Sequence, residues 1–216
     1  MEIVDKFKRL MILKILGFNT PDAIVIYRNE PTYKAVSKIL SFYKKYEKLS
    51  IRTFLDIEDY TYIPPHFPNL DRDEALLKTL ELLSAGYNIL LQQGVRPTNG
   101  DDEYLCLVMK TGNKIIIEMA KGPGTVRKLT IEGKIDDRFE ITSEEDEDYR
   151  RLPTELQYMY EIIKECELDN VIFEVSIYRE PVVGHNREVF WGFTKAGGVE
   201  EKIPKWILDR LRSYDL

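Results

Sequence analysis

The chain has 216 residues, of which 44% are hydrophobic and 31% are charged, and its formal net charge is -6. This length can bury a sizeable core, in one domain or in one domain with two lobes. The acidic balance excludes a general nucleic-acid binder, which needs a basic face for phosphates, but it is compatible with a local anion pocket. Two cysteines and two histidines are too few for a disulfide framework, a thiolate zinc site or a histidine-rich metal site.

The beginning of the chain predicts neither a secretory segment nor a membrane span. Residues 1–18 are amphipathic and dotted with lysines, and their longest apolar stretch is too short to cross a bilayer. We therefore expect a cytoplasmic protein that does not associate with membranes.

The first part of the chain predicts helices and strands in alternation. Apolar residues at helical spacing predict helices over 3–16 and 32–47. Short apolar runs predict strands over 22–27 and 49–54. Residues 60–71 are rich in Tyr, Pro and Asn, which predicts a loop. Alternation of this kind indicates an α+β layer.

The strongest helical pattern covers residues 72–94, with Asp71 at its start and Gly86 as a point where it could break. A tight turn between the apolar runs 103–111 and 114–120 predicts a β-hairpin. The acidic run 143–151 predicts a solvated connection. The remaining patterns predict strands over 126–133, 137–143, 170–180 and 187–195, and helices over 154–168 and 204–214.

One charged motif lies at the end of the second predicted strand. Arg52 is followed by the acid pair Glu58 and Asp59. An exposed ion pair beside a loop is the plain interpretation, and it is worth little energy. The alternative is a phosphate site, because arginine is a permanently charged, forked donor.

A second motif combines an acid with glycines. Glu118 lies near the end of a predicted strand that runs into Gly122, Pro123 and Gly124. Glycine lets the backbone approach a ligand closely and exposes amide groups to an anion. A plain turn is the alternative interpretation of this loop.

In this order the two motifs resemble the amino-terminal nucleotide-binding domain of phosphoenolpyruvate synthase and pyruvate phosphate dikinase, an ATP-grasp fold. That family has Arg-Ser-Ser-Ala-x-x-Glu-Asp and later Glu-x-x-x-Gly-Leu-Gly-Glu; here residues 52–59 are RTFLDIED and residues 118–125 are EMAKGPGT. Lys6, ahead of Pro21 and a strand, resembles the family's Gly-Gly-Lys followed by Val-Pro. Glu174 in VIFEVSI stands where the family has Ile-Glu-Trp.

The resemblance implies an α+β, ATP-grasp-like fold of two α+β lobes with largely antiparallel sheets. We expect a single unit over 1–216, with lobes at about 1–95 and 96–216. The implied ligands are ATP and magnesium. The residues implied to bind them are Lys6 and Arg52 at the phosphates, Glu118, Gly122 and Gly124 beside the nucleotide, and Glu174 and Asn186 at the metal.

The candidate residues also have structural interpretations. Lys6 can be a solvated lysine on an amphipathic helix, and Glu118 and Glu174 can face water on alternating strands. Trp191, beside Phe190 and Phe193, is more typical of a core residue than of an adenine platform.

Departures from the family pattern leave two functions open. Val4 and Asp5 replace the Gly-Gly, Phe54 replaces the second serine, and Thr125 replaces the closing glutamate. The first function is a phosphoenolpyruvate synthase-like protein that binds ATP and magnesium, with phosphotransfer to an unidentified acceptor or partner protein. The second is a degenerate scaffold or regulatory module with weak or no nucleotide binding. A homo-oligomer is compatible with both.

Overall fold

The computed structural model describes residues 4–54, 65–94, 104–122, 125, 128–129, 132–179, 186–197 and 202–212, without the side chains of 4–6, 179, 186 and 187. The chain forms two compact units. Unit 1 contains Met1–Lys8 and Pro21–Arg96, and unit 2 contains Arg9–Thr20 and Pro97–Leu216. The expectation of one ATP-grasp-like unit over the whole chain stays a prediction.

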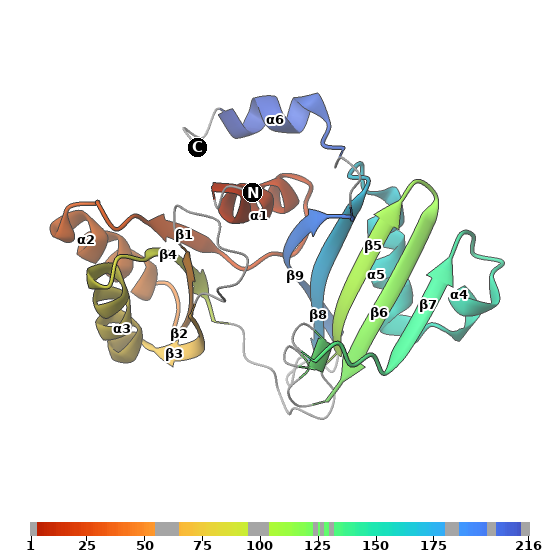
Figure 1. The fold of residues 1–216 in the computed structure, drawn as a ribbon, viewed down its shortest axis with the longest axis horizontal. Helices are drawn as coiled ribbons and strands as arrows, with labels where there is room; N and C mark the ends of the chain where they lie inside the picture. Colours follow the sequence, from red (N-terminus) through yellow and green to blue (C-terminus); the bar gives the residue numbers. More distant parts are fainter. Residues whose placement is uncertain are drawn as a thin grey trace. The chain divides into compact units, whose positions relative to one another are not determined.

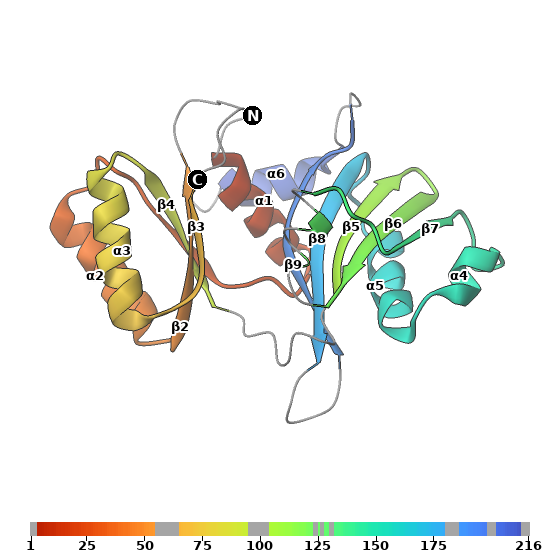
Figure 2. The ribbon, with the colours of Figure 1, turned by 60° about the horizontal axis from the view of Figure 1, so that its bottom comes forward.

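Unit 1 is a four-stranded antiparallel sheet with two helices. The strand order is β1-β4-β2-β3. Helices α2 (Thr32–Tyr43) and α3 (Arg72–Ser84) lie on the same face of this sheet (Figures 1 and 2). The strands are β1 (Ala23–Ile26), β2 (Lys48–Phe54), β3 (His66–Asp71) and β4 (Asn88–Gln93). The core between helices and sheet includes Ile26, Ile39, Leu49, Ile51, Leu82, Ile89 and Leu91.

Unit 2 is a five-stranded antiparallel sheet in the order β7-β6-β5-β8-β9. The strands are β5 (Tyr104–Thr111), β6 (Lys114–Lys121), β7 (Asp137–Ile141), β8 (Val171–Arg179) and β9 (Asn186–Lys195). The helices are α4 (Glu147–Arg151), α5 (Thr154–Glu165), α6 (Lys205–Arg212) and the part of α1 (Val4–Ile15) from Arg9 onward. Helix α5 covers one face of the sheet (Figure 1).

The core of unit 2 lies on that helix-covered face. Alternate strand residues such as Val108, Ile117 and Phe173 point to it, because side chains in a strand alternate between the two faces. They pack against apolar residues of α1, α5 and α6, which include Leu13, Leu156, Met159, Ile163 and Ile207. The predicted fold class, α+β with two antiparallel sheets, is therefore confirmed.

The loop predicted over 60–71 is wrong at its end, where β3 forms. The loop was predicted from the Tyr, Pro and Asn content of 60–71, of which 60–64 lie outside the described residues. Pro68, which lacks a backbone donor, lies within the strand. However, β3 is the edge strand of its sheet, where a missing donor is tolerated. Asn69 has a φ of 53°, and the β2–β3 register shifts nearby, so this strand is irregular.

The helix predicted over 72–94 is also wrong in its second half. Helix α3 ends at Ser84, and Gly86, with a φ of 88°, takes the left-handed conformation that ends helices. The apolar run that follows is the buried central strand β4. A buried strand and a buried helix both show continuous apolar residues, so their pattern alone does not separate them.

Smaller differences concern the loops of unit 2. The acidic run 143–151, predicted as a solvated connection, contains the short helix α4. Half of the strand predicted over 126–133 lies outside the described residues, and the described residues in this range, 128–129 and 132–133, do not form a strand, so that prediction is wrong there. Among the helices that the structure describes, none is long and apolar enough to span a bilayer.

Candidate functional site

Two predicted site residues, Glu118 and Glu174, lie in one row across the sheet of unit 2. In the strand register, Glu118 is opposite Leu107, Leu107 is opposite Glu174, and Glu174 is opposite Gly192. Directly opposed residues point to the same face of a sheet. The two carboxylates therefore share the face opposite α5, which we call the carboxylate face.

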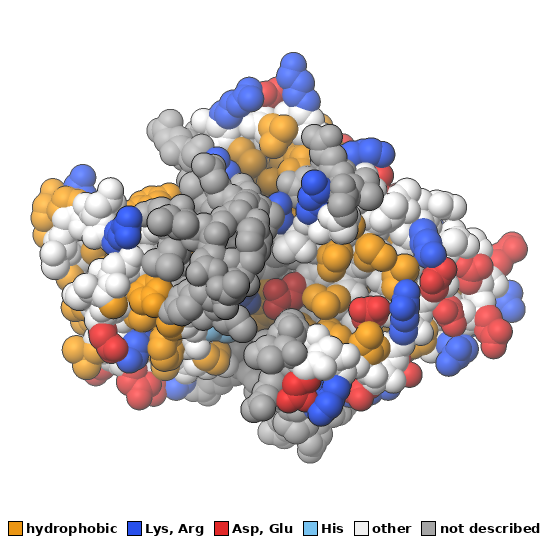
Figure 3. Space-filling view, viewed as in Figure 1, with side chains coloured by type: hydrophobic (Ala, Val, Ile, Leu, Met, Phe, Trp, Pro, Cys, Tyr) orange, Lys and Arg blue, Asp and Glu red, His pale blue; other side chains and the backbone are white. Residues whose placement is uncertain are grey.

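The two glutamates are close enough to act on one ligand. Two strand spacings separate them, which places their backbones about 10 Å apart. Glu118 and Glu174 are half-buried, and so is Leu107 between them. Figure 3 shows this face of unit 2, where hydrophobic side chains surround acidic ones over β5, β6 and β8. The row thus combines apolar surface with two carboxylates.

One arginine extends the row at the edge of the sheet. Arg138 on β7 is opposite Glu118 in the register, and its guanidinium nitrogen is 3.6 Å from a carboxylate oxygen of Glu118. The arginine side chain is 54% exposed and that of Glu118 is 30% exposed, so solvent weakens this ion pair. Arg138 can also contact an anion, and no pattern in the sequence indicated that role.

The connection that follows β6 contacts the carboxylate face at Leu129. Gly122 follows β6 with a φ of 73°, a conformation that glycine adopts at no steric cost. Farther along the same connection, Leu129 packs against Leu105 and Ala120. Leu105 lies two residues from Leu107 on one strand and so points to the same face. Glu118 and the described residue Leu129 of this connection therefore belong to one surface, whereas Pro123 and Gly124 lie outside the described residues.

Charged contacts hold the end of β6 at Lys121, just before the glycines. The backbone N–H of Lys121 donates to Asp136 at 2.7 Å, and the Lys121 ammonium donates to Asp137 at 2.6 Å. The bond to Asp137 raises the pKa of Lys121. The ammonium of Lys128 donates to the carbonyl of Lys121 at 2.9 Å. These bonds hold the end of β6 in place and occupy its basic groups.

Arg52 lies in unit 1, on the face of the four-stranded sheet that points away from α2 and α3. Leu49 and Ile51 point to the helices α2 and α3, so Ser50 and Arg52 point to the opposite face of the sheet. We call this surface the arginine face. Arg52 is half-buried there, directly opposite Leu90 on β4 and His66 on β3. Its convergence with the two glutamates stays a prediction.

A buried amide, Gln92, lies on the arginine face and was missed from the sequence. It is opposite Ser50 in the register and only 1% exposed. Neither its Nε2 nor its Oε1 has a hydrogen-bond partner. Buried amides nearly always have partners, so an unpaired one needs an explanation. The sequence could not single out Gln92, which stands in an apolar strand run. Its lack of hydrogen-bond partners depends on how the side chains pack in the folded protein.

Several predicted residues fall outside the described part of the chain. Gly124, Glu58 and Asp59 lie outside it. Lys6 belongs to α1 and Asn186 begins β9, but their side chains are not described. Their proposed roles stay predictions.

The residues on the carboxylate face fit magnesium in one particular way. Magnesium commonly uses one or two carboxylates and completes its shell with substrate phosphates and water. Glu118 and Glu174 supply carboxylates of that number. In the described ranges, no group of three or more His, Cys, Asp and Glu residues could hold a metal. The donor set therefore suits a metal that arrives with a phosphate ligand better than a permanently bound ion.

No protein-family model matches the chain, and no curated protein is similar to it in sequence. Solved structures with a similar course of the chain include the D-cycloserine synthetase DcsG, with 15% identity and a TM-score of 0.44 over 89% of this chain and 62% of that one. Another is the D-alanine-D-alanine ligase of Coxiella burnetii, with 12% identity and a TM-score of 0.44 over 97% and 56%. A third is a RimK domain ATP-grasp protein of Sphaerobacter thermophilus, with 15% identity and a TM-score of 0.43 over 95% and 62%.

The chain spans less than two thirds of each of these three proteins. At this level of similarity no residue role passes from them to this chain. The candidate site is defined by the carboxylate row and the arginine face themselves.

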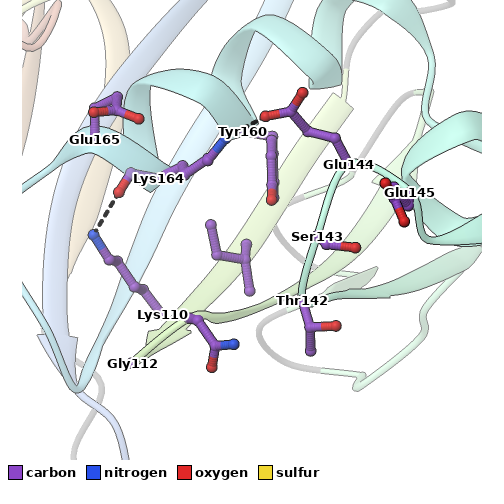
Figure 4. Close-up of a pocket in the computed structure, with 11 residues that line it drawn as sticks. Lys110, Gly112, Thr142, Ser143, Glu144, Glu145, Tyr160, Lys164 and Glu165 are labelled. Atoms are coloured by element: carbon purple, nitrogen blue, oxygen red, sulfur yellow. Dashed lines mark hydrogen bonds and ion pairs between the residues drawn. The ribbon is translucent and has the colours of Figure 1, made fainter.

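Unit 2 also has a hollow of about 630 Å³ on the helix side of the sheet (Figure 4). Lys110 and Lys164 line it, but both are engaged. The Lys110 ammonium donates to the carbonyls of Ile163, Lys164 and Cys166 at the end of α5, and Lys164 pairs with Glu144. An ammonium has three donors, so Lys110 has none left for an anion. This hollow therefore does not suit a nucleotide phosphate.

Neither thiol is suited to act as a nucleophile. Burial raises the pKa of Cys106 to about 12 and also raises the pKa of Cys166. The thiolate is the reactive form, so both side chains stay protonated and inert at neutral pH. Cys106 is a core residue, as predicted.

Proposed function

We propose that the chain binds ATP as its magnesium complex, in the manner of the ATP domain of the phosphoenolpyruvate synthase group, and passes phosphate to an acceptor or a partner protein. The observation that carries the proposal is the row of Glu118 and Glu174, which are far apart in the sequence and share one face. The charged contacts that hold Lys121 at the end of β6, directly before Gly122, add support.

Each candidate residue has a role in this proposal that suits its chemistry. Arg52 contacts nucleotide phosphates, for which a forked guanidinium is well suited. Glu174 holds magnesium, and Glu118 lies beside the nucleotide. When bound, magnesium neutralises charge on the transferring phosphate, and such transfer depends mainly on positioning and electrostatics.

Thermal unfolding with and without magnesium and ATP tests the binding. A ligand at a hundred times its dissociation constant stabilises a protein by about 2.7 kcal/mol. We expect a rise in melting temperature that needs both ATP and magnesium. Arg52→Ala should abolish it, whereas Arg72→Ala, an exposed arginine of the same unit, should not.

A second pair of variants tests the carboxylate row. Glu174→Gln should shift the magnesium requirement to higher concentrations, because a neutral amide is a weaker ligand than a carboxylate. Glu140→Gln changes an exposed glutamate of β7 outside the row and should leave the requirement unchanged. Equal effects of the two variants would contradict the role of the row.

The second function, a non-catalytic scaffold or regulatory module, is favoured by one observation. Glu118 already has a cationic partner in Arg138. No shift of the melting temperature with ATP, ADP or GTP would favour this second function. Binding without phosphate release would instead place the chain among nucleotide-responsive modules.

A further inference from the structure

A β-bulge on the carboxylate face directs a tryptophan to the side of the row. In the pairing of β8 with β9, Glu174 is opposite Gly192 but Val175 is opposite Phe190, so Trp191 is the extra residue. Bulges redirect side chains and occur often beside functional sites. Trp191 is half-buried rather than a core residue, in contrast to the expectation from its apolar neighbours.

The indole ring of Trp191 is held in one orientation. Its Nε1–H donates to the hydroxyl of Ser176 at 2.8 Å. Ser176 pairs with Leu105 in the register, and both point to the carboxylate face. The ring therefore lies on this face, beside Ser176 and two residues along β8 from Glu174, and cannot turn without losing that bond.

The space at Gly192 is open. Gly192 is the direct neighbour of Glu174 in the row, and a Cβ added to it meets no atom within 4 Å apart from those of its chain neighbours. The φ of Gly192 is not in the left-handed region, so the backbone does not require a glycine here. Half-buried Leu107 and Ile172 give the surroundings an apolar character.

We infer that Trp191 and Gly192 form a stacking subsite for a planar aromatic or heteroaromatic ring next to Glu174. A fixed indole offers a flat surface, and a ring on it requires the space that a side chain at Gly192 would occupy. The same chemistry suits the base of a nucleotide and a planar phosphate acceptor. The stacking subsite itself does not depend on the proposed function. Only the choice between a nucleotide base and a planar phosphate acceptor as its ligand rests on that function.

The test uses a protein with a single tryptophan. The chain has two tryptophans, and Trp206 is 44% exposed, so Trp206→Phe leaves Trp191 as the only reporter. Its fluorescence is followed during titration with benzoate, with adenosine and with cyclohexanecarboxylate, which matches benzoate but is not planar. We expect a saturable change with a planar probe and none with cyclohexanecarboxylate. Saturation by adenosine identifies the nucleotide base, and saturation by benzoate alone identifies an acceptor.

Gly192→Val in the same background fills the open space. We expect planar probes to bind about tenfold more weakly, which corresponds to the lower range of aromatic stacking energies. Gly192→Ala should give a smaller loss, and its unchanged melting temperature shows that the fold is intact. Unchanged affinity in Gly192→Val, or no response to either planar probe, would overturn the inference.

The two proposals fail in different ways. If magnesium and ATP still raise the melting temperature while planar probes leave Trp191 unaffected, the subsite is wrong and the proposed function stands. If planar probes bind but magnesium and ATP have no effect, the subsite stands and the proposed function is wrong.

Discussion

The buried amide of Gln92 leads to a prediction in which replacing a native polar residue increases the free energy of unfolding. Gln92→Leu should stabilise the protein without ligand, although it replaces a native residue in a central strand. Both polar atoms of the amide are buried without partners. Each such group costs about 1–3 kcal/mol, and the two atoms of one amide are not independent, so we expect a gain of about 1–2 kcal/mol. In a chain of this size that corresponds to a rise in melting temperature of about 2–8 °C.

Asn88→Leu is the matched control for this change. Asn88 lies on the same strand and the same face as Gln92 and is equally buried, at 1% exposure. However, its carboxamide oxygen accepts the backbone N–H of Arg28 at 3.0 Å. Losing this acceptor should destabilise the protein by about 1–3 kcal/mol. The two variants differ in hydrogen bonding rather than in burial, so opposite signs are expected.

Urea unfolding followed by circular dichroism measures both free energies. If Gln92→Leu destabilised the protein as much as Asn88→Leu, the amide would have to be hydrogen-bonded, and the reasoning would be refuted. The same variant bears on function. Loss of the melting shift with magnesium and ATP, together with a gain in stability, would show that the amide serves a ligand at the expense of the fold.

Three further changes have clear expected results. Lys110→Met should lower the free energy of unfolding by about 3 kcal/mol in urea titrations, because carbonyls at the end of α5 lose a charged donor. Gly94→Ala should lower the melting temperature strongly, because the new Cβ would lie 2.6 Å from the carbonyl carbon of Lys48; normal stability would show that the strands shift easily. The pKa of Asp146 is lowered because its carboxylate accepts backbone N–H groups. Its stabilising contribution is therefore present above the unfolded pKa of about 3.9 and is lost as the pH falls through the lower folded value, so Asp146→Asn should flatten acid unfolding in that range.

Local patterns predicted most elements of the fold. The hairpin of β5 and β6 was expected from two apolar runs around a tight turn, and α5 from its apolar spacing. The errors at β3 and β4 have a common cause. Whether Pro68 is tolerated depends on which strand forms the edge of the sheet, and whether residues 88–93 form a strand depends on neighbours on both sides. These are long-range properties, and local sequence does not contain them.

The amino-acid order alone determined that Glu118 and Glu174 interrupt apolar strands, and that glycines follow the first of them. Strand alternation then required each carboxylate to leave the core. Only the tertiary structure decided that both belong to one row with Leu107 between them, and that Trp191 lies beside it. The reason is that the pairing of distant strands sets the register, and a shift by one residue would move every side chain of a strand to the opposite face.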